Sequence, residues 1–294
     1  MTTPTVSIPD SEVHSLHSTF VEDDFELWIA KPQPGFVSSS ELPAVLYVLD
    51  ANLCFGTAVE MTRIMHKLYG ELPPILVVGI AYPTSDSFRQ GMLRNRDFTP
   101  SVDNSFADQV DSFLPDQPTA NVVPAMGGAE RFLRFLREEV QPFVTSQFEV
   151  AAENSTIFGS SLGGLFATYT LLKAPDTFDN FIIASPSLWW NQEEIFEMEA
   201  EQAAKAEALN SNVFLAVGGL EESPEIPMLA QFKAITNLKK FSDLLFKRND
   251  CSLQMALAIL PEETHTSSLP AAMTRGLRSC FRQERLSKAQ GVSL

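Results

Sequence analysis

The chain has 294 residues, of which 45% are hydrophobic and 22 are phenylalanine, and its formal net charge is −16. This composition can build a large α/β core, and the charge argues against a nucleic-acid or anionic-membrane partner, since both require a basic surface. We see no secretory signal and no apolar run of membrane-spanning length, so we expect a cytoplasmic protein. The cysteines at 54, 251 and 280 are too few and too scattered for a disulfide framework or a zinc site, and we expect no cofactor.

After two early strand-like segments, 13–20 and 25–30, apolar runs of strand length alternate with helical stretches. Continuous apolar runs suit strands that are buried on both faces of a parallel sheet. We therefore expect an α/β-hydrolase type of architecture, a mostly parallel sheet with helices on both faces, in one domain that spans residues 1–294. The further strands are expected at 42–49, 74–81, 155–158, 181–184, 213–217 and 253–260, and the helices at 52–69, 129–143, 165–172, 192–209, 227–248 and 268–286.

Residues 89–128 interrupt this alternation. The segment is mostly polar, contains prolines and has no convincing periodicity. A loop of that length is uncommon inside a compact domain and is often a functional lid. We expect either a lid or substrate loop here, or a partly ordered surface excursion.

The most informative motif is a G-x-S-x-G pattern at residues 159–163, centred on Ser161. A strand-like segment precedes it and a helical segment follows, and a sharp turn between the two would lift the serine hydroxyl clear of the sheet. Flanking glycines relieve crowding in such a turn, and the helix N-terminus supplies free N–H groups. The alternative is a chance match of three positions. If the motif is a nucleophile elbow, Ser161 is the nucleophile of a hydrolase or an acyltransferase.

A serine hydroxyl needs a base to remove its proton, and the base is usually a histidine. His14 and His17 fall on an early, peripheral strand, and His66 falls on a helix where a surface or packing role suffices. His265 instead follows the last expected strand. Catalytic groups in open parallel sheets gather beyond the carboxyl ends of strands, so we predict His265 as the base.

An acid that orients the histidine should follow an intervening strand. Glu221 and Glu222 both do so, and the sequence does not separate them. Asp179 and Glu193 are weaker candidates because neither directly follows a strand. The alternative for Glu221 and Glu222 is a solvated turn.

The oxyanion that forms when a serine attacks a carbonyl needs preorganised N–H donors. One expected donor is the backbone N–H of Leu162, the residue after Ser161. The second should come from the loop after an earlier core strand, where Ala51 and Asn52 are the candidates.

Several longer segments resemble the putative-esterase family of α/β-hydrolases, which includes siderophore esterases, feruloyl esterases, S-formylglutathione hydrolases and mycolyltransferases. They cover nearly the whole chain and look most like the siderophore-esterase-like branch. The resemblance implies Ser161 as nucleophile, His265 as base and a carboxylate at Glu221, with a Ser–His dyad as the alternative. A departure is Ala51, where many relatives have glycine. Besides the elbow and the segment ending in His265, these segments are VLYVLD (45–50), VGIAYP (78–83), RDFTP (96–100), GGAERF (127–132) and SPSLWW (185–190).

Four further side chains are expected near the substrate. Trp189 and Trp190 follow a strand end, and their apolar rings with a polar N–H suit ring-bearing ligands, although one of the two should be core. Arg96 resembles the position where relatives grip anionic or catecholic groups, and a structural ion pair with Asp97 is the alternative. Ser160, the residue before Ser161, is also expected to bind the substrate.

We therefore predict a serine carboxylic-ester hydrolase that acts through an acyl-enzyme on a small-molecule ester or lactone, with a siderophore-like compound as one candidate. An acyltransferase or macrocyclising enzyme that uses the same site is the second hypothesis. A non-catalytic binding protein on a degenerate hydrolase fold is the third. Substrate identity depends on the shapes of residues 89–128 and of the tryptophan pair, which the sequence does not specify.

Overall fold

The computed structural model describes residues 6–36, 41–68, 70–105, 125–205, 207–248 and 252–281. Its strands form one sheet in the order β1-β2-β4-β3-β5-β6-β7-β8. The β1–β2 and β2–β4 pairs are antiparallel, and every other neighbouring pair is parallel. The strands are β1 (Ser11–Ser18), β2 (Asp23–Ala30), β3 (Ala44–Val48), β4 (Ile75–Ala81), β5 (Ser155–Ser160), β6 (Asn180–Ala184), β7 (Asn212–Gly218) and β8 (Gln254–Leu260).

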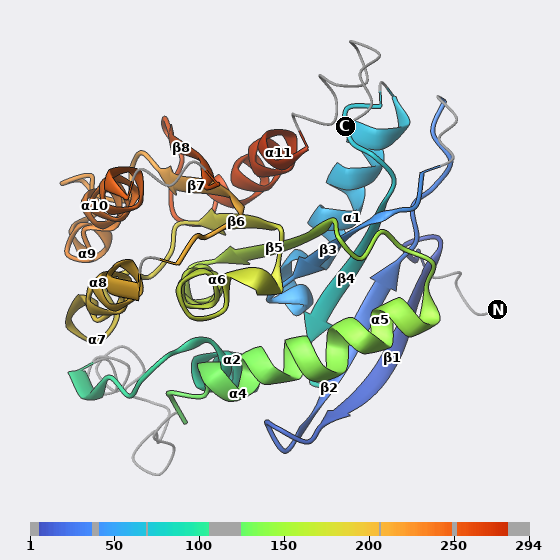
Figure 1. The fold of residues 1–294 in the computed structure, drawn as a ribbon, viewed down its shortest axis with the longest axis horizontal. Helices are drawn as coiled ribbons and strands as arrows, with labels where there is room; N and C mark the ends of the chain where they lie inside the picture. Colours follow the sequence, from blue (N-terminus) through green and yellow to red (C-terminus); the bar gives the residue numbers. More distant parts are fainter. Residues whose placement is uncertain are drawn as a thin grey trace.

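Helices cover both faces of this sheet (Figure 1). Helices α1 and α11 pack on one face, and the remaining long helices pack on the other. The predicted architecture, a mostly parallel sheet between two helical layers, is confirmed. The longer helices are α1 (Ala51–Lys67), α2 (Ser87–Phe98), α4 (Ala129–Phe135), α5 (Gln141–Gln147), α6 (Leu162–Lys173), α8 (Ile195–Lys205), α10 (Ala234–Lys247) and α11 (Ser268–Cys280).

The central strand β3 shows why its sequence is apolar without interruption. Successive side chains of a strand point to opposite faces. Val45 and Tyr47 therefore join the cluster under α4, α6 and α10, while Leu46 and Val48 join the cluster under α1 and α11. Both sets are buried, so no position along this strand faces water.

The structure corrects the expectation for the start of the 89–128 segment. A helix, α2, runs through Ser87–Phe98. It begins at Asp86, whose carboxylate accepts hydrogen bonds from the backbone N–H groups of Phe88 and Arg89. The helix is largely polar and partly exposed, so it has little of the apolar periodicity by which helices are recognised. Residues 106–124 of the expected lid lie outside the described part of the chain.

Other helix boundaries differ in smaller ways. The expected 192–209 helix is divided into α7 (Trp190–Glu193) and α8, with left-handed backbone at Asn191 and Gln192. The expected 227–248 helix is divided into α9 (Pro227–Ala230) and α10. The expected 129–143 helix continues from α4 through a π-helical turn, Leu136–Val140, into α5.

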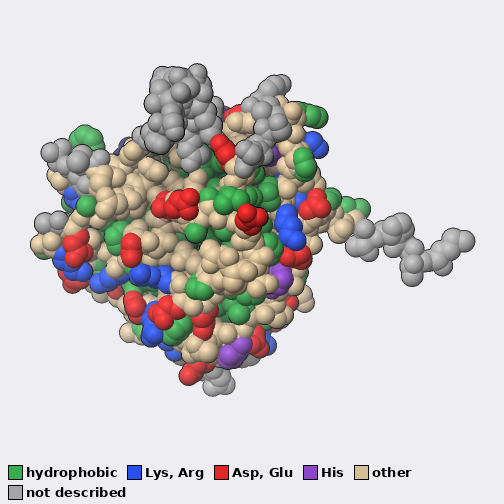
Figure 2. Space-filling model, turned by 45° about the vertical axis from the view of Figure 1, so that its right-hand side comes forward, with side chains coloured by type: hydrophobic (Ala, Val, Ile, Leu, Met, Phe, Trp, Pro, Cys, Tyr) green, Lys and Arg blue, Asp and Glu red, His purple; other side chains and the backbone are tan. Residues whose placement is uncertain are grey.

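On the face drawn in Figure 2, acidic side chains lie beside most of the basic ones, and apolar side chains lie between them. Within the described residues, no helix combines the length and the apolar character needed to cross a lipid bilayer.

Candidate active site

Four polar residues follow four neighbouring strands at one edge of the sheet. Ser161 follows β5, Ser185 follows β6, Glu221 follows the end of β7, and His265 follows β8. Because β5 to β8 are parallel neighbours in this order, their carboxyl ends meet at the same edge. This is the edge at which open α/β sheets place ligands.

Ser161 lies at a strained turn between β5 and α6. Its backbone has φ 59° and ψ −120°, which is unusual for a residue with a side chain. The backbone N–H of Ser161 donates to the carbonyl of Ala184 at 3.0 Å, and its carbonyl accepts from Leu165 at 2.9 Å. Position 159 requires glycine, because the backbone of Gly163 lies so close that a Cβ at this position would overlap its carbonyl. The turn therefore has the geometry that the G-x-S-x-G pattern predicts.

His265 and Glu221 are in direct contact. The Nδ1 atom of His265 lies 2.7 Å from Oε2 of Glu221. The Glu221 side chain is 3% exposed, while that of His265 is 32% exposed. The carboxylate can thus hold the imidazole with Nδ1 protonated, which leaves Nε2 free to accept a proton.

Two buried donors hold the other oxygen of Glu221. The hydroxyl of Ser185 donates to Oε1 at 2.5 Å, and the backbone N–H of Gly218 donates to the same atom at 2.8 Å. The hydroxyl of Ser268 lies 3.3 Å from that of Ser185 and also donates to the carbonyl of His265 at 3.1 Å. This buried network fixes the carboxylate and the histidine loop relative to each other.

The competing acids lie elsewhere. Glu222 accepts hydrogen bonds from the backbone N–H and the hydroxyl of Thr236. Asp179 holds the start of β5 through Ser155, and Glu193 pairs with Lys240.

The other histidines also have partners outside the site. His14 and His17 lie on β1 beside Glu12 and Asp24, and His66 contacts the carbonyl of Leu72. Of the described histidines, His265 alone lines the same cavity as Ser161.

Ser161 and His265 open into one cavity of about 630 Å³. Ser160 also contributes to its wall. The start of α1 and part of α2 also line it, including Asn52, Leu53, Gln90 and Arg94. Leu269 and Pro270 at the start of α11 complete an apolar side, so the cavity suits a small molecule that combines apolar and hydrogen-bonding groups.

The candidate oxyanion donors lie at two helix N-termini beside this cavity, which is lined by Ser161 and Asp50, the residues directly before Leu162 and Ala51. Leu162 is the first residue of α6, and Ala51 and Asn52 are the first two of α1. The N–H groups of a first helical turn have no acceptor within their own helix. The left-handed conformation at the α1 turn falls on Asp50, with φ 54°, so the methyl group of Ala51 is accommodated in an ordinary helical residue.

Arg94, which sequence reasoning missed, lines the cavity, and Arg96 does not. Arg94 makes a two-point ion pair with Asp50, Nε to Oδ1 at 2.8 Å and Nη2 to Oδ2 at 2.9 Å. Burial alone would lower the pKa of the Arg94 guanidinium, but the Asp50 carboxylate raises it above its usual value. Arg96 is held by Asp97 and by Asp23, at 2.7 and 2.6 Å, the structural ion pair that the sequence left as its alternative.

The two tryptophans have other surroundings. Trp190 is fully buried, and its indole N–H donates to the carbonyl of Ser101 at 3.3 Å. Trp189 is half-buried and stacks on Phe232 with ring centroids 4.4 Å apart. Neither is among the residues that line the cavity of Ser161. The sequence led us to expect that one of the two belongs to the core, and Trp190 is buried there.

The chain is also similar to known esterases. The family model described as "Putative esterase" matches residues 18–254. The ferri-bacillibactin esterase BesA of Bacillus subtilis is 32% identical over 279 residues, covering 92% of this chain and 90% of that protein. The siderophore enterobactin esterase of Emericella nidulans is 34% identical over 199 residues, covering 65% and 62% of the two chains.

Solved structures agree in fold. The structure of the BES protein from Bacillus cereus has a TM-score of 0.78 at 29% identity, covering 95% of this chain and 99% of that one. The siderophore hydrolase EstB from Aspergillus nidulans has the same TM-score at 24% identity, covering 95% and 97%, and supports the fold alone. The chain is an α/β-hydrolase that belongs to the putative-esterase family.

Proposed function

We propose that this carboxylic ester hydrolase works through Ser161 as nucleophile, His265 as general base and Glu221 as the acid that orients the histidine. The observation that carries the proposal is the 2.7 Å contact between His265 Nδ1 and Glu221 Oε2, together with the shared cavity of His265 and Ser161. This arrangement matches the roles of a Ser-His-acid triad.

The mechanism then follows the chemistry of acyl transfer. The Ser161 hydroxyl attacks the ester carbonyl while His265 Nε2 takes its proton, and the resulting oxyanion is bound by the N–H of Leu162 and by those of Ala51 or Asn52. Protonated His265 gives its proton to the leaving alcohol, which departs and leaves Ser161 acylated. Water attacks the acyl-enzyme with His265 again as base. When the second tetrahedral intermediate collapses, protonated His265 returns its proton to the Ser161 oxygen and the carboxylic acid leaves.

We infer that the substrate is a small-molecule ester or lactone of the siderophore type. One relative is named a ferri-bacillibactin esterase and another a siderophore enterobactin esterase. The cavity of about 630 Å³ is of a size that holds a small molecule. Its wall offers amide and hydroxyl groups beside the apolar side chains of Leu53, Leu269 and Pro270.

The test is a comparison of the wild type with Ser161→Ala on p-nitrophenyl esters of varied acyl length and on a siderophore trilactone. We expect Ser161→Ala to lose turnover of every ester while its thermal unfolding stays unchanged. Ser146→Ala, on the exposed side of α5, is the matched control and should keep full activity. Turnover that survives in Ser161→Ala would reject the assignment, and product analysis with an added alcohol or amine separates hydrolysis from acyl transfer.

A further inference from the structure

The turn between β3 and α1 carries an unusual residue. Asp50 has left-handed backbone, φ 54° and ψ 42°, and its side chain makes no capping hydrogen bond to α1. A residue other than glycine adopts this conformation at a cost and keeps it only where its surroundings fix it. Because Asp50 directly precedes Ala51 and Asn52, its conformation sets where their N–H groups point.

Arg94 of α2 is the group that fixes Asp50. Both carboxylate oxygens are engaged, by Nε at 2.8 Å and by Nη2 at 2.9 Å. A two-point pair between planar groups defines orientation as well as distance. The guanidinium also lies 5.6 Å from the centre of the Phe98 ring on the same helix, so the arginine is itself held in place.

The carboxylate of Asp50 also reaches the other candidate oxyanion donor. A Cβ built at Gly163 would lie only 3.3 Å from Oδ2 of Asp50, so this oxygen packs against the first turn of α6, next to Leu162. An unpaired carboxylate here would repel a developing oxyanion. Arg94 therefore provides both the orientation of the turn and the neutralising charge.

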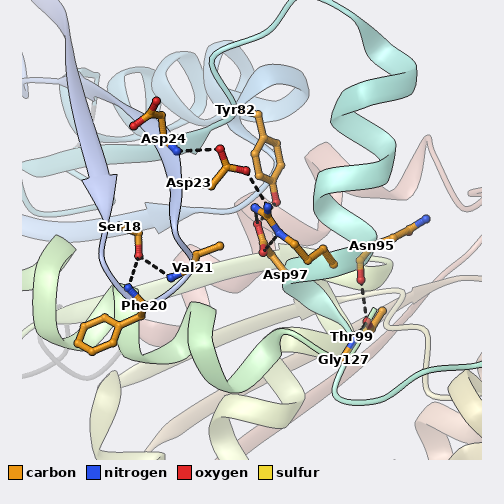
Figure 3. A network of polar contacts seen from close by, with 11 residues as sticks. Ser18, Phe20, Val21, Asp23, Asp24, Tyr82, Asn95, Asp97, Thr99 and Gly127 are labelled. Atoms are coloured by element: carbon orange, nitrogen blue, oxygen red, sulfur yellow. Dashed lines mark hydrogen bonds and ion pairs between the residues drawn. The ribbon is translucent and has the colours of Figure 1, made fainter. Parts of the chain in front are cut away.

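The same helix supports the other end of the turn. The Asn52 side chain accepts from the backbone N–H of Tyr82 at 2.8 Å and donates to its carbonyl at 3.0 Å. The Tyr82 hydroxyl donates to Asp97 of α2 at 3.1 Å. Asp97 is in turn held by Arg96. Figure 3 shows Tyr82, Asp97 and Asp23 within this network. Helix α2 thus supports the turn directly through Arg94 and indirectly through Tyr82.

We propose that Arg94 is a positioning residue that acts through Asp50 to hold the 50–52 turn and its N–H donors against the reacting carbonyl. The inference rests on the proposed function. It differs from a substrate-binding role for Arg94, because the two guanidinium nitrogens that would grip an anion are already bound to Asp50.

The experiment measures kcat and KM of Arg94→Met, Asp50→Asn and their double variant on a neutral ester and on a matched ester with an acyl carboxylate. We expect Arg94→Met to lower kcat on both by about 10-fold to 100-fold, the range for misplaced catalytic geometry, with KM little changed. The affinity for a trifluoromethyl ketone, which forms a tetrahedral adduct, should fall in proportion. Arg89→Met, on the exposed side of α2 and outside the cavity, is the control and should match the wild type.

Two further readouts separate positioning from a structural role. Added guanidinium ion should restore part of the kcat of Arg94→Met, since it refills the vacated charge site. The double variant should be more active than Arg94→Met, because Asp50→Asn removes the unpaired carboxylate. If Arg94→Met does not fold, the more conservative variants Arg94→Lys and Asp50→Asn are compared with the wild type instead. Both should have a lower kcat.

Three outcomes overturn the proposal. One is a rise in KM confined to the anionic ester in Arg94→Met, which would make Arg94 a substrate ligand. Another is improved use of the anionic ester by Asp50→Asn, which would mean that Asp50 masks a binding site. The third is unchanged kcat in Arg94→Met. If Ser161→Ala is inactive while Arg94→Met is fully active, this inference is rejected and the proposed function stands. If activity survives in Ser161→Ala, the proposed function itself is rejected.

Discussion

Replacing Glu221 by glutamine tests the acid directly and leaves the shape of the site intact. The Glu221 carboxylate faces three donors, namely Ser185 and Gly218 at Oε1 and His265 at Oε2. A carboxamide has one oxygen and one NH₂ group. Its oxygen is best placed toward the two donors at Oε1, so its NH₂ group then faces Nδ1 of His265. That nitrogen must become the unprotonated one, and Nε2 then carries the proton and cannot accept another from Ser161.

The magnitude follows from the same contact. Two unit charges 2.7 Å apart interact by about 6 kcal/mol at an effective dielectric constant of about 20. The imidazole is about one-third exposed, so solvent screening reduces this value. At about 1.4 kcal/mol for each tenfold change in rate, we expect Glu221→Gln to lower kcat by about three to four powers of ten. The equivalent acid-to-amide change in a Ser-His-Asp protease costs about 10⁴ in kcat.

The assay is steady-state hydrolysis of a p-nitrophenyl ester, with Glu222→Gln as the matched control. Glu222 contacts Thr236 outside the site, so its variant should stay within about threefold of the wild type, as expected of a surface change. Both variants should unfold at similar temperatures, since Ser185 and Gly218 keep an acceptor. A Glu221→Gln enzyme within about tenfold of the wild type would refute the reasoning and leave a Ser–His dyad. A large loss in Glu222→Gln instead would assign the wrong carboxylate.

Two predictions concern other ionisable groups. Burial raises the pKa of the Cys54 thiol to about 12, so iodoacetamide at about pH 8 should leave Cys54 unmodified in the native enzyme and alkylate it after denaturation; rapid native labelling would contradict this. Burial alone would raise the pKa of Asp23, but the hydrogen bond from Arg96 lowers it below its ordinary 3.8. Asp23 therefore stabilises the fold above that pH and less as the pH falls through the lowered pKa. Asp23→Asn should lower the free energy of unfolding in urea by about 1 kcal/mol or less at neutral pH, with the difference vanishing in strong acid; a difference that grows in acid would contradict the sign.

The positions of Ser161 and His265 at one sheet edge could be predicted because each follows a strand that the local sequence reveals. Apolar runs locate β5 and β8, and parallel strands place their carboxyl ends together. The choice between Glu221 and Glu222 could not be made this way. Adjacent residues in a turn point in different directions, and only the path of the chain after β7 sends Glu221 inward and Glu222 toward Thr236.

Ser185 shows a different limit. The sequence places it in the SPSLWW segment after a strand, but its hydroxyl becomes important only because β6 lies between β5 and β7 in the sheet. The strand order is a property of the whole fold. A serine at the end of the middle strand can reach the acid of the next one, and this contact is invisible to any local pattern.

The misassignment of Arg96 has a physical cause that also explains why Arg94 matters. Read as part of a loop, residues 89–128 give no reason to prefer one arginine over another, and resemblance selected Arg96. Once α2 is a helix, residues two apart point about 200° from each other. Arg94 then faces the α1 turn and Asp50, and Arg96 faces Asp23 and Asp97. One polar helix therefore directs Arg94 to the 50–52 turn and Arg96 to Asp23 at the start of β2. The sequence signal for this helix was the N-terminal cap at Asp86 rather than an apolar stripe.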